Sequence, residues 1–189
     1  MTEQEYFTVH HNLTINVEAL GSDFALPDEN TFVSEIPAPF IVASEFSQLD
    51  MLADKARLEL QNKELKHVIN LLDTQNAKLN LLLSFMLSQQ DEAMVRFQTT
   101  QFGASQLSYR SDIEIDVEQV VRVKLFLDHP AAAIYCYAQV VECEPSEQGF
   151  VITLRYKLLR ETDQDLLIKA ALYQQQKLLR QRSLERDNK

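Results

Sequence analysis

The residues that could bind a metal or attack a substrate are few and poorly spaced. Of the four histidines, His10 and His11 are adjacent and would point to opposite faces of a strand. No zinc-like spacing joins any histidine to a cysteine or a carboxylate. The two cysteines, Cys136 and Cys143, would also lie on opposite faces of one extended run. The sequence therefore predicts no metal site and no disulfide framework.

Sequence motifs for catalysis are missing as well. The chain has no G-x-S-x-G, Walker A or G-x-G-x-x-G sequence, and its three glycines leave little material for a phosphate-binding loop. Glu114 and Asp116 have the spacing of a carboxylate pair, but they most simply form the wet face of a strand. Cys136 stands between Tyr135 and Tyr137 and is expected to pack rather than react. We expect no enzymatic activity and no cofactor.

Composition and net charge indicate a globular protein and argue against some kinds of partner. The 189 residues are 46% hydrophobic and 24% charged, as in soluble globular chains with one domain and an extension. A net charge of -10 argues against a nucleic-acid partner, because phosphate binding needs clustered lysine and arginine. Lys177, Arg180, Arg182 and Arg186 fit a helix C-terminus, where the dipole favours cations. An acidic start without a signal peptide, and no long apolar stretch, predict a cytoplasmic protein without membrane insertion.

The elements that would position any site change their periodicity along the chain. Leu13, Ile15 and Val17 alternate with polar residues, which predicts a half-buried strand. The segment 21–43 holds three of the five prolines and is predicted to be an irregular connector rather than a helix.

A helical region is predicted from residue 44 to residue 96, which contains no glycine or proline. Its first part, 45–60, is either a separate helix or the opening of one long helix. Two interleaved series with heptad spacing predict a coiled-coil seam. The seam residues are Leu58, Leu65, Ile69, Leu72, Asn76, Leu79, Leu83 and Met86.

We expect this seam to be buried between copies of the chain. The alternative is one amphipathic helix packed on its own domain, but apolar residues almost surround the stretch 79–87. Asn76 inside the seam would fix its register and favour parallel association. Such an asparagine favours dimers in simple zippers, whereas the wide apolar surface favours four helices. A tetramer is preferred, and a dimer stays open.

Beyond residue 100 the apolar residues recur with a period of two as far as residue 156. Turns at 128–130 and 145–149 divide this stretch into short strands, as in a meander, a sandwich or a barrel. A final helix is predicted from Thr162, which would cap it, with Asp165 three residues later.

Four segments in the later half of the chain form a recognisable series: QFGASQLSYRS at 101–111, VVRVKLFL at 120–127, AQVV at 138–141 and the closing helix from 162 onward. In this order they resemble a PilZ domain, a small barrel best known for binding cyclic di-GMP. The strand at 13–17 is similar to the opening strand of the family. This resemblance implies an α+β fold in which an antiparallel barrel is interrupted by the helical region.

The order of these segments implies three parts. Residues 1–20 and 97–186 would form the PilZ-like barrel, 21–43 the connector, and 44–96 an inserted oligomerisation region. The arrangement is similar to an atypical PilZ subgroup in which inserted helices with heptad repeats assemble parallel tetramers.

The ligand motifs of the family are degenerate in this chain. The positions of the R-x-x-x-R motif fall on Gln4 and Thr8. Those of the D/N-x-S-x-x-G motif fall on Gln101, Gly103 and Gln106. Losing two charge-assisted contacts, at roughly 1.5–3 kcal/mol each, would weaken binding at least about a hundredfold.

The sequence thus predicts a non-enzymatic oligomeric signalling adaptor that binds an unidentified protein partner. One alternative is a cyclic di-GMP receptor with a non-standard site, for which Arg110 lies nearby. The other is a structural protein of unrelated fold, whose first strand would not join the later sheet.

Overall fold

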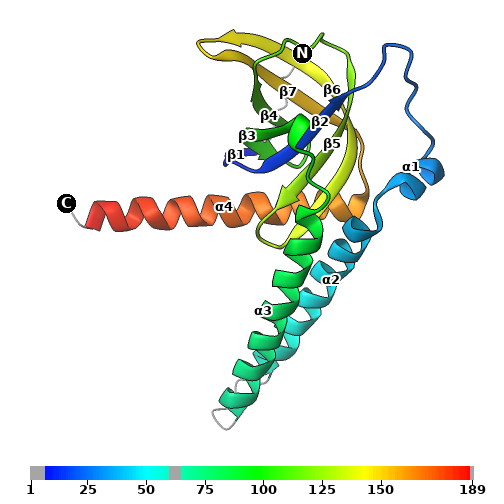
Figure 1. Cartoon of the computed structure of the whole chain (residues 1–189). Helices are drawn as coiled ribbons and strands as arrows, with labels where there is room; N and C mark the ends of the chain where they lie inside the picture. Colours follow the sequence, from blue (N-terminus) through cyan, green and yellow to red (C-terminus); the bar gives the residue numbers. More distant parts are fainter. Residues whose placement is uncertain (1–6, 60–64, 188–189) are drawn as a thin grey trace.

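A closed antiparallel β-barrel forms the centre of this computed structural model, which describes residues 7–59 and 65–187 (Figure 1). The strands lie in the order β1-β3-β2-β5-β6-β7-β4, and a pairing between β3 and β4 closes the ring. Strands β1 and β2 pair with opposite ends of β3 and together make one side of the barrel. The strands are β1 (Thr8–His10), β2 (Thr14–Ala19), β3 (Arg96–Gly103), β4 (Gln106–Ser111), β5 (Val120–Leu127), β6 (Ala132–Ser146) and β7 (Gly149–Leu158).

Alternating side chains explain why these segments close around one core. In β5 the side chains of Val121, Val123 and Leu125 are fully buried, and the residues between them are only half-buried. Burying each of these side chains stabilises the fold by about 2 kcal/mol. The predicted α+β fold class, a small antiparallel barrel with helices before β3 and after β7, is confirmed.

The strand that precedes the helices is a full member of this barrel. Ile15 in β2 lies opposite Phe97 of β3 on one side and Leu125 of β5 on the other. The unrelated fold considered as an alternative required this strand to stay outside the later sheet. Its pairing with both neighbours rules that alternative out.

The prediction of an irregular connector at 21–43 is wrong in two places. Helix α1 spans Glu29–Glu35, and helix α2 spans Ala38–Glu59. Asp28 caps α1, since its side chain accepts hydrogen bonds from the backbone N–H of Thr31 at 3.0 Å and from the Thr31 hydroxyl at 3.0 Å. Proline does not prevent the start of α2, because first-turn N–H groups have no partner within a helix.

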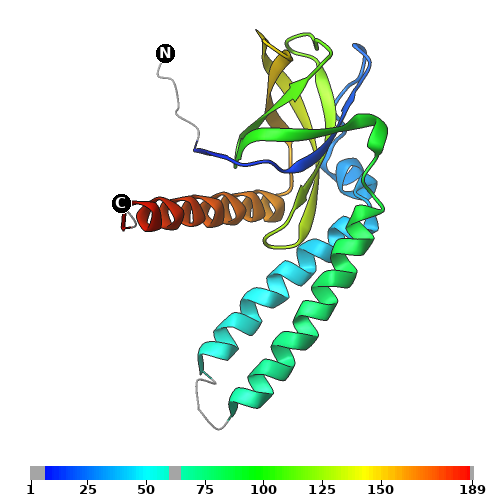
Figure 2. The same cartoon turned by 60° about the vertical axis from the view of Figure 1, so that its left-hand side comes forward.

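The helical insertion is a hairpin rather than one long helix. Helix α3 spans Lys66–Ser88 and lies beside α2 in both views (Figures 1 and 2). Arg57 of α2 forms an ion pair with Asp73 of α3. In one continuous helix their Cα atoms would be about 24 Å apart. The alternative of a separate first helix is therefore correct, and a single seam from Leu58 to Met86 is wrong.

The C-terminal helix α4 (Glu161–Asp187) crosses one end of the barrel (Figure 1). The predicted helix is present, but it begins before Thr162, so the prediction that Thr162 caps it is wrong. Leu166, Leu167, Ala170 and Ala171 of α4 are buried against the barrel. Near its start the buried carboxylate of Asp163 accepts two hydrogen bonds from the Arg160 guanidinium, both at 2.8 Å. No helix in the described ranges is long and apolar enough to cross a membrane.

Candidate functional site

Three of the positions that the PilZ resemblance assigns to ligand motifs meet where β1 pairs with β3. Thr8 lies opposite Gly103, and the Thr8 hydroxyl donates to Gln101 Oε1 at 3.3 Å. Gln101 Nε2 donates to the Ser108 hydroxyl at 3.1 Å, and Ser108 Oγ is 3.0 Å from Thr153 Oγ1. A chain of uncharged side chains thus crosses four strands, from β1 to β7.

The remaining two positions do not add a charge to this cluster. Gln106 follows the turn after β3 and lies opposite Arg155 of β7. Gln4 lies outside the described residues. The amide of Gln101 is engaged by its neighbours Thr8 and Ser108 rather than left open for a guanine edge.

Gly103 is required by the packing of β1. A Cβ atom at this position would lie 2.1 Å from the backbone oxygen of Phe7, which is too close for any other residue. The space beside Gly103 is therefore filled by the chain itself.

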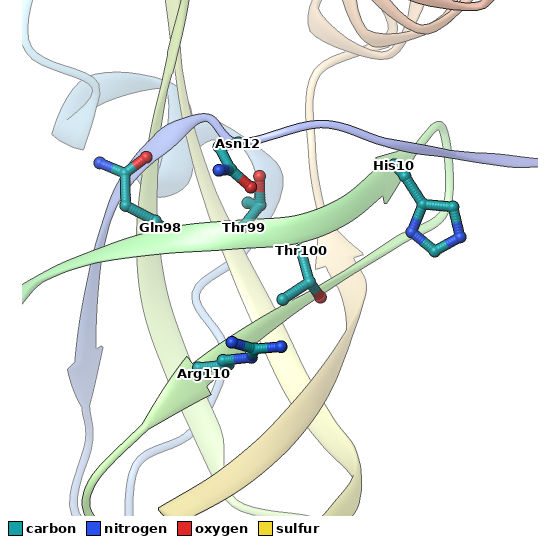
Figure 3. Close-up of a pocket in the computed structure, with 6 residues that line it drawn as sticks. All are labelled: His10, Asn12, Gln98, Thr99, Thr100 and Arg110. Carbon is teal, nitrogen blue, oxygen red and sulfur yellow. The ribbon is translucent and has the colours of Figure 1, made fainter. Parts of the chain in front are cut away.

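A shallow hollow of about 500 Å³ lies next to this cluster, on the outer face of β1, β3 and β4 (Figure 3). Among the described residues that line it, Arg110 of β4 and His10 of β1 are the titratable ones, and none carries a carboxylate. The hydroxyl of Thr100 donates to the Ser108 backbone oxygen at 3.2 Å. The lining residues are His10, Asn12, Gln98, Thr99, Thr100 and Arg110.

This hollow could hold one anionic group beside Arg110. The position of Arg110 is visible in the sequence but the hollow is not, because the segment 10–12 meets the β3–β4 pair only in the folded chain. One guanidinium in an open hollow offers charge-assisted contacts from a single side chain.

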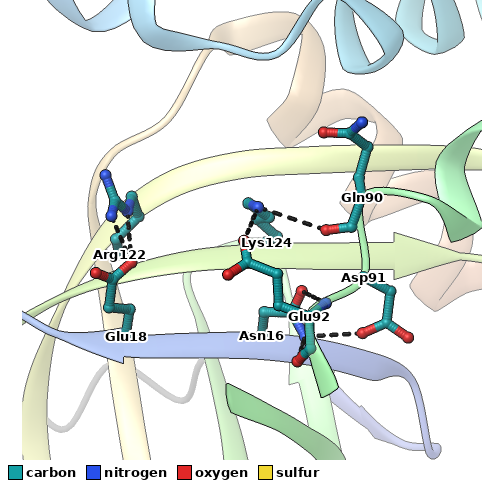
Figure 4. Close-up of polar contacts among 7 residues, drawn as sticks. All are labelled: Asn16, Glu18, Gln90, Asp91, Glu92, Arg122 and Lys124. Carbon is teal, nitrogen blue, oxygen red and sulfur yellow. Dashed lines mark hydrogen bonds and ion pairs between the residues drawn. The ribbon is translucent and has the colours of Figure 1, made fainter. Parts of the chain in front are cut away.

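A polar anchor fixes the place where the helical insertion returns to the barrel (Figure 4). The buried Asn16 side chain donates to Asp91 Oδ1 at 2.9 Å and to the Glu92 backbone oxygen at 3.2 Å. It also accepts a hydrogen bond from the Glu92 backbone N–H at 2.9 Å. Lys124 of β5 forms an ion pair with Glu92 and donates to the Gln90 backbone oxygen at 3.4 Å. These contacts hold the base of α3 against β2 and β5.

A groove of about 360 Å³ runs between the two helices of the hairpin. It includes the predicted seam residues Ile69, Leu72, Asn76 and Leu79. Leu72 is 57% exposed and Leu79 is 46% exposed, so a single chain does not bury them. Small side chains at Ala53 and Ala56 of α2 keep the groove open. It is lined by Ala53, Ala56, Arg57, Ile69, Leu72, Asp73, Gln75, Asn76 and Leu79.

The other seam residues differ in exposure. Met86 is 46% exposed and Leu65 is half-buried. Leu83 is only 3% exposed, because the base of α3 packs on the chain's own core, so its assignment to an interface between copies is wrong. The side chain of Leu58 lies outside the described part.

The titratable groups inside the barrel do not form a reactive site. Burial raises the pKa of the Cys136 thiol, which keeps it protonated and unreactive at neutral pH. Burial likewise raises the pKa of Tyr109 and Tyr156, whose hydroxyls are buried without a hydrogen-bond partner in the described structure. No cluster of metal-binding side chains occurs within residues 7–59 and 65–187.

Solved structures resemble this chain, although no family model and no curated protein sequence matches it. One is a pathogenic protein from Xanthomonas campestris, described as a tetrameric PilZ domain self-assembled through a helical bundle. It is 13% identical, with a TM-score of 0.59 over 94% of this chain and 92% of its own. Another is the Bacillus subtilis inhibitor of motility, MotI/DgrA, which is 11% identical, with a TM-score of 0.48 over 94% of this chain and 53% of its own. At these identities the likeness concerns the fold, and on the first of these structures the chain has a PilZ-type fold.

Proposed function

We propose that the chain is a non-enzymatic PilZ-fold module that assembles with copies of itself through the α2–α3 hairpin and acts by protein contacts. The observation that carries this proposal is the exposure of leucines on the hairpin. Leu71 is 60% exposed and Leu82 is 62% exposed, in addition to Leu72 and Leu79 of the groove. A helical surface this apolar is stable in water when another helix covers it.

A homotetramer is the assembly that this surface favours. The Xanthomonas campestris protein of similar fold is described as a tetramer built by a helical bundle, and its likeness extends over the helical hairpin as well as the barrel. A second copy would place its leucines against the groove between α2 and α3. A dimer would cover less of the exposed surface.

The assembly would present several barrels at fixed spacing to one protein partner. Linked binding sites raise the overall affinity for a multivalent partner because the second contact is intramolecular. The unpaired cysteines Cys136 and Cys143 are compatible with a reducing compartment such as the cytoplasm. These features support a signalling adaptor.

Light scattering tests the assembly. Changing Leu72→Asp together with Leu79→Asp places two carboxylates in the groove, and the mass should fall from that of a tetramer to that of a monomer at micromolar concentration. Leu26→Asp is the matched control, since Leu26 is 41% exposed but lies outside the hairpin, and its mass should not change. An intact chain that is already monomeric would contradict the proposal.

The same proposal holds that cyclic di-GMP does not bind. Calorimetric titration of the intact chain should give no heat of binding at micromolar ligand, because the described motif positions Thr8, Gln101, Gly103 and Gln106 carry no positive charge.

The alternative, a receptor with a non-standard site, is supported by the hollow beside Arg110. It predicts micromolar binding that Arg110→Ala abolishes. Lys157→Ala is the control, because Lys157 is an exposed cation on β7 that does not line the hollow.

A further inference from the structure

The outer end of α4 packs against no other part of the chain that the structure describes. Buried residues of α4 end at Gln174, and Leu178 is half-buried. From Leu179 to residue 184 every side chain is exposed, and Figures 1 and 2 show this part of the helix extending past the barrel.

This outer end combines apolar and cationic side chains. Leu179 is 57% exposed and Leu184 is 64% exposed. Lys177, Arg180 and Arg182 are exposed beside them, in a chain whose net charge is -10. Two such ends would repel each other because both are cationic. The outer end is therefore complementary to an acidic surface that also exposes apolar side chains.

The chain carries a surface of that kind at the far end of its barrel. We name it the acidic rim. Its apolar members are Ile113, which is 73% exposed, and Val117, which is 54% exposed. No lysine or arginine occurs in 112–119 or 142–147. The exposed acids of the rim are Asp112, Glu114, Asp116, Glu118, Glu142, Glu144 and Glu147.

Its two segments start side by side. Gly149 follows the β6–β7 turn, and a Cβ atom there would lie 2.4 Å from the backbone oxygen of Ser111, so the loop after β4 begins against that turn. Among the described residues, the ion pairs involve Asp73, Asp91, Glu18, Glu92 and Asp163, and no acid of the rim.

The two surfaces cannot meet within one chain. In Figure 1 the β6–β7 turn lies at the top of the barrel, whereas α4 crosses below it. A contact between them therefore has to join two copies, with a different surface used on each.

We propose that the outer end of α4 docks on the acidic rim of a second copy. Leu184 would cover Ile113 and Val117. Arg180, one turn before Leu184 on the same face of the helix, would face the carboxylates of Glu114 and Asp116, and Arg182 would flank the contact. Because each copy keeps one unused surface of each kind, the contact can repeat from copy to copy. It does not depend on the hairpin, so it would link assemblies that the hairpin has already formed.

Salt sensitivity and charge exchange test this contact. Sedimentation velocity of the full chain should show at least a twofold larger mean mass at about 0.02 M salt than at about 0.5 M salt, because exposed charges are screened at the higher concentration. Arg180→Glu with Arg182→Glu should remove the difference, and so should Glu114→Lys with Asp116→Lys. The four changes combined in one chain should restore it, since the charges are exchanged but remain complementary.

Three controls separate this proposal from others. Lys157→Glu alters net charge as much as Arg182→Glu alone does, but it lies on β7 and should leave the salt dependence intact. The hairpin variant Leu72→Asp with Leu79→Asp should still show a mean mass that depends on salt, although the hairpin no longer joins its copies. Failure of the hairpin proposal can therefore be told apart from failure of the α4 contact. Circular dichroism checks that every variant is folded.

A mass that does not change with salt, or a combined variant that fails to recover it, would overturn the proposal. Binding of the salt-insensitive chain to vesicles rich in phosphatidylserine, lost with Arg180→Glu and Arg182→Glu, would overturn it in favour of a membrane surface.

Discussion

The barrel and the helical hairpin bury their apolar side chains in different ways. In the barrel, Leu107, Leu125 and Ile152 are completely covered by other parts of the same chain. In the hairpin, Leu72 and Leu82 remain more than half exposed although the helices pack on each other. The barrel core is covered within one chain, whereas in the proposed assembly a second copy would cover the hairpin. Stability of the first should not depend on protein concentration, and stability of the second should.

The largest effect should come from the barrel core. Leu125→Ala should lower the free energy of unfolding by about 4 kcal/mol, because it removes a fully buried side chain and leaves a cavity. Urea unfolding at two protein concentrations should give the same loss. Ile113→Ala, at a position 73% exposed, should change stability by less than about 0.5 kcal/mol. A loss that depends on protein concentration would mean that the barrel core also relies on a second copy.

Nearly as large a loss is expected where α4 joins the barrel. Arg160→Leu leaves the Asp163 carboxylate buried without its cation and should cost about 3 kcal/mol at neutral pH. Burial disfavours the charged form of Asp163 and raises its pKa, whereas the Arg160 guanidinium favours the charged form and lowers the pKa. In the variant the folded pKa rises further above the unfolded value. The protonated form of Asp163 contributes stability that is fully present below the pKa of the unfolded state. This contribution is lost as the pH rises through the pKa of the folded state.

The Arg160→Leu deficit should therefore shrink as the pH falls toward about 4. Urea unfolding over a pH series measures it. Arg182→Leu removes an exposed cation from the same helix and should show little loss at any pH. A deficit that does not vary with pH would mean that Asp163 stays charged in the variant.

Two adjacent leucines locate the boundary between the part of α3 that packs on the barrel and the part that stays exposed. Leu83 is 3% exposed at the base of α3, and Leu82 is 62% exposed. In the monomeric Leu72→Asp, Leu79→Asp background, Leu83→Ala should lower the free energy of unfolding by about 2 kcal/mol. Leu82→Ala should lower it by less than about 0.5 kcal/mol. Equal losses would place the boundary elsewhere on α3.

The smallest effect is expected on the barrel surface. Glu18 and Arg122 form an ion pair across β2 and β5, with side chains 47% and 36% exposed (Figure 4). Glu18→Gln should cost less than about 1 kcal/mol in urea unfolding, because solvent screens an exposed pair. The loss should diminish in high salt. A larger, salt-independent cost would show that this pair is part of the barrel's closure.

Period-two alternation made the strands predictable, and the PilZ resemblance selected a barrel from the meander, sandwich or barrel that this pattern allowed. Val121, Val123 and Leu125 face inward as their spacing required, and the heptad series was correctly identified as helical. Reversal of the chain between α2 and α3 was not predictable, since 44–96 contains no glycine or proline to mark it. Helix α1 was missed because three prolines in 21–43 outweighed the capping aspartate at position 28.

The candidate site was only partly accessible from the sequence. The sequence alone showed that Thr8 and Gln101 differ from the residues that PilZ ligand motifs carry at these positions. Their mutual hydrogen bond was not visible in the sequence, because 93 residues separate them. Leu83 had the spacing of a seam residue, and only tertiary packing shows that its own barrel covers it.

The position of the hairpin between β2 and β3 also matters for the covalent integrity of the chain. A cut between α2 and α3 would give two fragments, and each would lack strands that the other supplies. The first would carry β1 and β2, whose partners β3 and β5 belong to the second. Asn16 would still bind Asp91 and Glu92 across the break. Two such fragments should remain together without a covalent link, and two separately expressed pieces should reconstitute one barrel.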